Sequence, residues 1–323
     1  MIPAKDRELE LDACLAALRR SEHTSYEVLV VDDGSRDATA AVAERHGCRV
    51  VRHSECRGAA AARNSGARAA RGEILLFIDS DVAADADLLP EVDKSFAALE
   101  AQAVTGLLKK DSLNRNFASQ YDALYMHYQY WTHPEEMDIF YTSCAAIRRP
   151  IFLAEGGFDE HYKGAGIEDM ELGQRLTRNG VRLVINKRLQ VAHAHPFTAR
   201  ELVLKNRRTA AGTLKILLRN LASKRPSRRM VAPQWSFLMG IPMTLLAVAT
   251  LLLAAIVHPA FAAIAVALLG FVLHLNRRFL GFLLRERGHG FVFLACGFLF
   301  LNYLAYAAGL VTGALGFAAG SRY

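Results

Sequence analysis

The chain has few cysteines, and their spacing matches no metal-binding or redox-active pair. Among its 323 residues there are five. They are Cys14, Cys48, Cys56, Cys144 and Cys296. No two of them form a C-x-x-C pair or another zinc-binding spacing, which argues against a zinc ribbon or a redox dithiol. We therefore expect reduced, mostly buried thiols in a domain that faces the cytosol.

Acidic residues are nearly absent from the last third of the chain. Past Glu201 the only one is Glu286, although the whole chain has 32 Asp and Glu against 39 Lys and Arg. The net charge of +7 therefore belongs to this third, where basic residues flank apolar runs. That pattern is typical of the cytoplasmic side of a membrane protein. We expect membrane lipids, and no nucleic acid, among the partners.

An amino-terminal apolar leader is also missing, since charged residues recur from Met1 to Arg20. Membrane insertion is instead expected from residues 231–323. Three stretches there lack Asp, Glu, Lys and Arg and are predicted to span the membrane, the middle one being near the lower length limit. They are about 235–257, 259–275 and 290–318.

Charges around these stretches predict their orientation. Basic residues lie at 224–229 and at 276–287, whereas the turn at His258-Pro259 has none. The positive-inside rule then predicts three spans, an external carboxyl terminus and a cytoplasmic catalytic domain. The chain would be a multi-pass protein of the cell inner (cytoplasmic) membrane. A buried helical bundle is the alternative.

Residues 199–230 are expected to form an amphipathic, basic interfacial helix and linker to the first span. From Ala199 to Ala222 an apolar face opposes a basic one, which is typical of a helix lying on an anionic lipid surface. The apolar face is Val203, Ala210, Leu214, Leu217 and Leu221, and the basic face is Lys205, Arg207, Arg208, Lys215 and Arg219. A surface helix packed on its own domain would show the same pattern.

Residues 1–198 alternate short apolar runs with helix-like stretches, which predicts an α/β domain with a Rossmann-like, mostly parallel sheet. Glu27–Val31 and Glu73–Ile78 are the clearest strands. Helices are predicted at 38–46, 59–70 and 88–100. Acidic clusters follow both strands, at the sheet edge where such folds bind ligands.

The residues after these strands suggest a nucleotide site. Asp79 and Asp81 are costly to place together without a cation, and their oxygens suit Mg²⁺ or Mn²⁺ beside a diphosphate. Asp33 could accept a hydrogen bond from uracil or ribose, and Arg63 could approach a base or phosphate. Each also has a simpler explanation: solvated turns for the acids and an ordinary surface position for the arginine.

A second acidic pair follows the glycines at 164 and 166. Glu168 and Asp169 would begin a helix, where carboxylates are common partners of the helix dipole. A general base could also meet an acceptor hydroxyl there.

Taken in order, these motifs resemble those of family 2 glycosyltransferases of the GT-A fold. The resemblance covers about residues 1–195. It rests on Ile2-Pro3-Ala4, VDDGS at 31–35, ARNSGARAARGEILLFIDSD at 62–81, GGFDE at 156–160 and GIEDMELGQRL at 166–176. It implies that Pro3, Ala4 and Asp33 contact the nucleoside, that Asp79 faces ribose and diphosphate, and that Asp81 binds the metal. It further implies that Asp169 is the catalytic base, that Glu168 positions the acceptor, and that His193 is a metal ligand; a structural histidine is the alternative.

Two departures from the family pattern qualify this interpretation. Only Met1 precedes Ile2, so either the first strand is shortened or the chain begins further upstream. The Q-x-x-R-W motif of processive synthases is absent, so a single addition is expected.

The predicted reaction is inverting and metal-dependent, from a nucleotide-sugar (a UDP-sugar rather than a GDP-sugar) to a lipid-linked or glycan acceptor at the cytoplasmic membrane face. Such an enzyme would serve cell-envelope polysaccharide or glycolipid synthesis. A polyprenyl-phosphate sugar synthase, a non-catalytic nucleotide-sugar-binding scaffold and a nucleotidyltransferase are the alternatives.

Overall fold

The fold is seen in a computed structural model that describes residues 1–98, 100–162, 167–222 and 235–321. These residues fall into two compact units. One runs from Met1 to Pro196, and the other holds the described residues from Phe197 onward. The second unit includes residues 199–222 of the predicted linker 199–230, whose other residues lie outside those that the structure describes.

The first unit begins with the βα units that the sequence predicts. Its first three strands form a parallel sheet in the order β1-β2-β3. The elements are β1 (Ile2–Ala4), α1 (Glu8–Leu18), β2 (Leu29–Asp32), α2 (Thr39–Arg45), β3 (Arg49–Arg52) and α3 (Ala59–Ala69). The parallel order brings the ends of β1 and β2 together, so the backbone N–H of Asp33 donates to the carbonyl oxygen of Ala4 at 2.9 Å.

A second sheet of five strands has the order β4-β7-β6-β8-β5. Its strands are β4 (Ile74–Ile78), β5 (Val82–Ala84), β6 (Ala103–Leu108), β7 (Cys144–Arg148) and β8 (Leu183–His193). Here only β6 and β8 pair in parallel, whereas β7 runs antiparallel to both of its neighbours. The parallel sheet expected from the sequence is therefore realised in β1–β3, and the second sheet is mixed. Apolar runs reveal strands but not their direction, which here depends on the long connection from β6 to β7.

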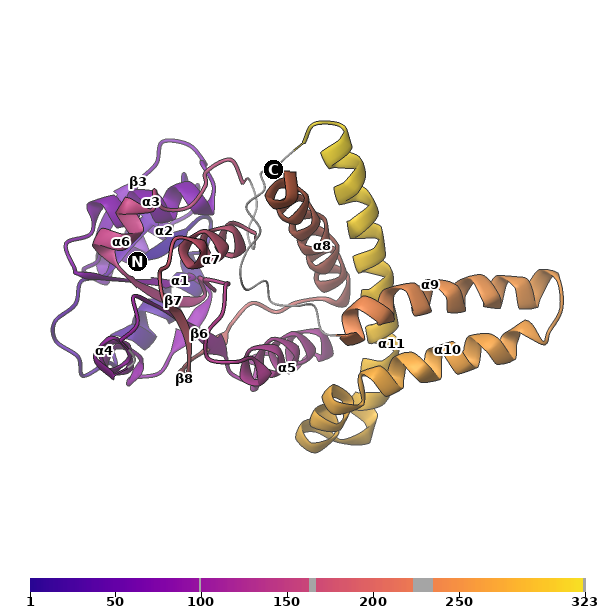
Figure 1. The fold of residues 1–323 in the computed structure, drawn as a ribbon. Coiled ribbons are helices and arrows are strands. Elements are labelled where there is room, and N and C mark those ends of the chain that lie inside the picture. Colours follow the sequence, from indigo (N-terminus) through magenta and orange to yellow (C-terminus); the bar gives the residue numbers. More distant parts are fainter. Residues whose placement is uncertain (99, 163–166, 223–234, 322–323) are drawn as a thin grey trace. The chain divides into compact units, whose positions relative to one another are not determined.

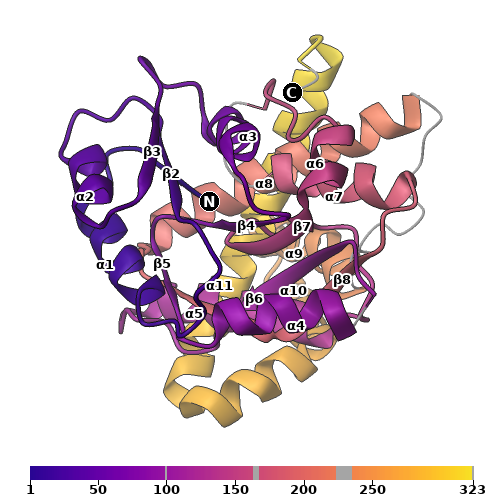
Figure 2. The same cartoon turned by 90° about the vertical axis from the view of Figure 1, so that its left-hand side faces the viewer.

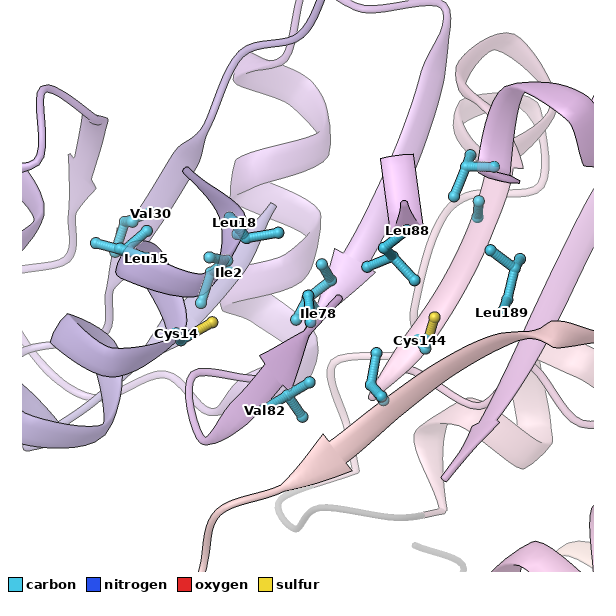
Figure 3. Packing of buried hydrophobic residues seen from close by; sticks show 14 of the residues in the cluster. Ile2, Cys14, Leu15, Leu18, Val30, Ile78, Val82, Leu88, Cys144 and Leu189 are labelled. Carbon is cyan, nitrogen blue, oxygen red and sulfur yellow. The ribbon is translucent and has the colours of Figure 1, made fainter. Parts of the chain in front are cut away.

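Helices cover both faces of the sheets (Figure 2). The remaining helices of this unit are α4 (Leu88–Ala98), α5 (Phe117–Thr132), α6 (Arg149–Ala154) and α7 (Glu168–Arg178). Strand β4 contributes side chains to two hydrophobic cores. Ile78 packs in the core formed with α1, α2 and α4 (Figure 3), and Phe77 packs in the core formed with α3, α6 and α7. Burial on both faces explains the continuous apolar run of β4. The apolar run stops at Ile78, so Asp79 is the first residue after the strand.

The five cysteines are free thiols. Cys14 and Cys144 are buried in the core shown in Figure 3, whereas Cys56 is exposed. Cys48 and Cys296 are half-buried, so the expectation of mostly buried thiols is confirmed only for Cys14 and Cys144.

The second unit is helical. Its elements are α8 (Ala199–Ala222), α9 (Trp235–Ile256), α10 (Phe261–Leu275) and α11 (Arg277–Ala318). Helices α9 and α10 lie side by side as a hairpin (Figure 1), and α11 is interrupted at Gly288, whose φ of 79° suits glycine. Two helices, Ser236–Ile256 and Arg277–Ala318, are long and apolar enough to cross a membrane, while Phe261–Leu275 is shorter. The predicted count of three spans is thus not confirmed.

Candidate active site

The Asp79-Ser80-Asp81 segment joins β4 to β5, which stand at opposite ends of the five-strand order. Because β5 pairs with β8, Val82 lies opposite His193. This register brings the Nε2 atom of His193 to 3.5 Å from Oδ1 of Asp81, although 112 positions separate the two in the sequence numbering. The structure thus brings together two of the three predicted metal ligands.

The third predicted metal ligand, Asp79, accepts hydrogen bonds from two side chains of this chain. Arg63 donates to its Oδ1 at 2.8 Å and Ser143 to its Oδ2 at 2.7 Å. Burial alone would raise the pKa of Asp79, but the charge of Arg63 and these hydrogen bonds hold it below the usual value. Sequence reasoning missed Ser143, which lies in no recognised motif.

Arg63 lies at the centre of the site rather than on the surface. It is 3% exposed, and its guanidinium joins Asp79 to Glu168, whose Oε1 accepts from Nη1 at 2.8 Å. The guanidinium also stacks over the ring of Phe158 at 5.6 Å. A buried arginine needs such compensating acids, and it fixes two carboxylates that come from the end of β4 and from α7.

Asp169 is the next residue of α7 and is also buried. Burial, followed by the neighbouring charge of Glu168, raises its pKa to about 7, and Arg63 opposes the shift. Its Oδ1 accepts from the N–H of Met170 at 2.7 Å. A carboxyl group with a pKa near neutrality is well matched to general acid–base catalysis at cellular pH.

We predict that two neighbouring substitutions move the acid limb of the pH–activity profile in opposite directions. Glu168→Gln removes a negative charge, lowers the pKa of Asp169 and moves the limb to lower pH. Arg63→Gln removes a positive charge, raises that pKa and moves the limb to higher pH. On the limb, the ionised fraction of Asp169 changes about tenfold when its pKa changes by about one.

The measurement is log(kcat/KM) against pH for both variants. Arg68→Gln, on the outer side of the same helix α3, is the matched control and should leave the profile in place. Displacement of the limb in the same direction for both variants would mean that another group controls it.

The loop at 156–160 is held against α3. Asn64 forms two hydrogen bonds with the backbone of Phe158, donating to its carbonyl oxygen and accepting from its N–H, both at 2.8 Å. Gly157 has φ of +69°, and a Cβ there would collide with the Asn64 side chain. The ring of Phe158 packs on Phe77 with centroids 5.5 Å apart. Sequence reasoning missed Asn64, whose position beside Arg63 was the available signal.

Asp33 is buried and fully engaged. Its Oδ1 accepts from His53 Nδ1 at 2.7 Å and from the N–H of Arg57, and its Oδ2 accepts from the N–H of Gly58 at 2.8 Å. Burial opposes ionisation, but these donors outweigh it and lower the pKa of Asp33. Asp33 therefore anchors the loop that leads into α3. Its predicted contact with the nucleoside, like those of Pro3 and Ala4 on β1, stays a prediction.

The residues present fit a divalent cation that also binds the donor. Among the residues described, no group of three His, Cys, Asp or Glu side chains is arranged to hold a metal. Asp81 and His193 offer two adjacent donors, which suits Mg²⁺ or Mn²⁺ because these ions share their coordination with phosphate oxygens and water. Such an ion would stabilise the negative charge of a departing diphosphate.

Comparisons with known proteins identify the family of the amino-terminal part of the chain. Residues 1–154 match the model of the family described as "Glycosyl transferase family 2". The amino-terminal part of the chain is therefore a domain of glycosyl transferase family 2, and the resemblance seen in the sequence is confirmed over these residues.

Individual relatives cover different parts of the chain. Over 115 residues it is 39% identical to a dolichyl-phosphate beta-glucosyltransferase of Drosophila melanogaster, covering 31% of this chain and 34% of that protein. Over 233 residues it is 25% identical to glycosyltransferase AglE of Haloferax volcanii, and this match covers 70% of this chain and 75% of that protein. The chain spans about half or less of the length of the first curated relatives it matches.

Among solved structures, the mannosyltransferase PcManGT of Pyrobaculum calidifontis, in complex with GDP-Man and Mn²⁺, has a TM-score of 0.55 and 20% identity. The match covers 99% of this chain and 84% of that one. At this identity the likeness shows the fold, which is that of a GT-A glycosyltransferase.

Proposed function

We propose that the chain is an inverting, metal-dependent glycosyltransferase that moves one sugar from a nucleotide-sugar to an acceptor at the cytoplasmic membrane face. The observation that carries the proposal is the buried Asp169, with its pKa raised to about 7, next to Glu168, which Arg63 joins to Asp79 at the end of β4. The family 2 match supports the same reaction class.

Each residue of the site has a role in this proposal. Asp169 accepts the proton of the acceptor hydroxyl as that oxygen attacks the anomeric carbon. Asp81 and His193 would hold the cation at the diphosphate. Arg63 keeps Asp79 and Glu168 in place, so that Asp79 can meet the donor ribose and Glu168 the acceptor. Pro3, Ala4 and Asp33 contact the nucleoside, for which we favour uridine over guanosine.

A lipid-linked acceptor is favoured over a soluble one. The second unit contains helices apolar enough to cross a membrane, and α8 places the cations Arg207 and Arg208 at its surface. One relative is named for dolichyl phosphate, which is a lipid phosphate. For this reason a polyprenyl-phosphate sugar synthase is the second candidate function. A phosphate acceptor is already ionised, so Asp169 would contribute less as a base in that reaction.

The first experiment is donor profiling. The purified full chain is incubated with a panel of UDP- and GDP-sugars and Mn²⁺, and release of nucleoside diphosphate is measured. We expect turnover with a single sugar class. Binding of a donor without turnover, in the presence of membrane lipid extract, would favour the non-catalytic scaffold.

We further predict that neutralising Arg207 and Arg208 together raises the apparent KM for a lipid-phosphate acceptor, because the two cations would attract its headgroup. Roughly 1 kcal/mol for each cation near the surface corresponds to a tenfold or larger rise in KM. Hydrolysis of the donor should not change. The control is Arg45→Gln with Arg52→Gln, two exposed cations of the first unit. Equal KM values in both double variants would mean that Arg207 and Arg208 do not bind the acceptor headgroup, and a lower KM for a water-soluble acceptor would then argue for a soluble one.

A further inference from the structure

Helix α8 packs along the part of α11 that follows Gly288, residues 289–318 (Figure 1). The contacts progress in the same direction on both helices. Asn206 donates to Asn302 Oδ1 at 2.9 Å, and Lys215 donates to Ser321 Oγ at 2.7 Å. The two helices are therefore parallel neighbours, here called the α8–α11 pair.

Glycines bring the two backbones of the α8–α11 pair into contact. A Cβ on Gly309 would collide with the carbonyl oxygen of Arg207, and one on Gly313 would lie 2.6 Å from that of Ala211. Two glycines four positions apart lie on one face of α11 and leave room for the backbone of α8 to approach closely. The buried side of α8 is accordingly Leu202, Ala210, Gly212, Ile216 and Asn220. It differs from the apolar face expected from the sequence, which includes the exposed Leu221.

This packing conflicts with a transmembrane course for 290–318. The contact of Arg207 with Gly309 lies within that stretch, so a spanning helix would carry α8 through the hydrocarbon beside it. Arginine and lysine are strongly unfavourable at the centre of the bilayer. Helix α8 carries Arg200, Lys205, Arg207, Arg208, Lys215 and Arg219, and Arg207 and Arg208 are exposed. The parallel direction would also carry Lys215 and Arg219 toward the outer face, against the positive-inside rule.

The α9–α10 hairpin contacts α11 near its base. Tyr303 donates to the carbonyl oxygen of Ser236 at 2.9 Å and accepts from Asn276 at 3.0 Å. Its ring packs against Gly240. Beyond this base the hairpin runs crosswise to the second part of α11 (Figure 1) and exposes large apolar side chains. These include Leu245, Leu246, Leu252, Ile256, Ile264 and Val266.

Helix α9 has the length, and the α9–α10 hairpin has the charge pattern, of a membrane-inserted element. The 21 residues of α9 from Ser236 to Ile256, none of them charged, extend about 31 Å at 1.5 Å per residue, which matches the hydrocarbon thickness. The 15 residues of α10 extend about 22 Å, so α10 forms a shorter arm of the hairpin. The turn at His258-Pro259 carries no Lys, Arg, Asp or Glu, whereas Arg277 and Arg278 follow its base.

We propose that only the α9–α10 hairpin enters the bilayer core and that the α8–α11 pair lies flat on the anionic headgroup surface. The exposed stripe Leu294, Leu301, Val311 and Leu315 of α11 then faces the acyl boundary. Helix α9 crosses the bilayer and α10 crosses it back. The carboxyl terminus therefore lies on the same side of the bilayer as α8. This proposal replaces three spans with two and does not depend on the reaction catalysed.

Two tags on the full chain test the topology. A short cysteine-containing tag precedes Met1 in one form and follows Tyr323 in the other, with Cys56 changed to Ser to remove the exposed thiol. A membrane-impermeant maleimide is applied to intact cells and to inside-out vesicles. We expect both tags to react only in the vesicles. Reaction of the carboxyl-terminal tag in intact cells, with the amino-terminal tag protected, would establish an odd number of spans and overturn the proposal.

Depth measurements test the flat orientation separately. Tryptophan is placed at Val311 on α11 or at Leu252 on the hairpin, after Trp131 and Trp235 are changed to Phe, and the protein is reconstituted in vesicles. Lipids brominated near the headgroup should quench the tryptophan at 311 more strongly, and lipids brominated deep in the chain should quench that at 252. Equally deep quenching at both positions would show that α11 lies within the hydrocarbon and contradict the proposal.

Discussion

Asp169→Asn is expected to lower kcat by about 10²–10⁴-fold, the usual contribution of general base catalysis. The asparagine keeps the shape of the side chain but cannot accept the acceptor proton. Donor affinity should change little, because the donor is expected to contact Asp79 and Asp81 rather than Asp169. The measurements are single-turnover kinetics at saturating donor, and a donor titration by calorimetry.

The pH profile sharpens this prediction. Asp169 must be ionised to act as a base, and its pKa is raised to about 7. The rate of the native enzyme should therefore rise with pH through about 7 and then level off, whereas the residual rate of Asp169→Asn should lack this limb. Asp87→Asn, an exposed acid of the same unit, is the matched control. Loss of donor binding with normal turnover of bound donor would make Asp169 a binding residue instead.

Much of the first unit could be predicted because strands such as β2 and β6 are buried on both faces. The apolar run ending at Ile78 placed both the strand and the acids after it, and the helix at 59–70 appears as Ala59–Ala69. Strand direction in the second sheet could not be predicted, since local patterns carry no information about partners.

The site was only partly predictable for a related reason. Asp81 and His193 meet through pairing between the three-residue strand β5 and the end of β8, and so short a strand has no detectable period. Arg63 looked like a surface cation because it sits in an alanine-rich helix. Its burial depends on Asp79 and Glu168, acids that are distant in sequence.

In the second unit, composition predicted the helices but not their packing. Helix α8 runs from Ala199 to Ala222 as expected. Small residues such as Gly212 and Ala210 form its buried side, because close backbone approach to α11 matters more there than hydrophobicity. Hydropathy also does not distinguish an apolar helix that crosses the bilayer from one held beneath a basic helix.

Removal of divalent metal is the second large effect that we expect. Treatment with excess EDTA should abolish turnover, and Mn²⁺ or Mg²⁺ should restore it. Asp81→Ala should lower kcat/KM on the order of 10³-fold even at saturating metal. The physical reason is that a cation at a departing diphosphate contributes several kcal/mol, and each step of about 1.4 kcal/mol is a factor of ten.

The two candidate ligands should differ in which ion they favour. His193→Ala removes an imidazole and leaves the carboxylate of Asp81 nearby, 3.5 Å away in the native chain. Imidazole suits transition metals, whereas carboxylate suits Mg²⁺ and Mn²⁺ alike. The variant should therefore lose more affinity for Mn²⁺ than for Mg²⁺, as measured by titrating each ion against donor binding. Asp85→Ala, which removes an exposed acid just after β5, is the control for Asp81→Ala. Full turnover of the native enzyme in excess EDTA would refute metal dependence, whereas an unchanged ion preference in His193→Ala would leave His193 a structural residue.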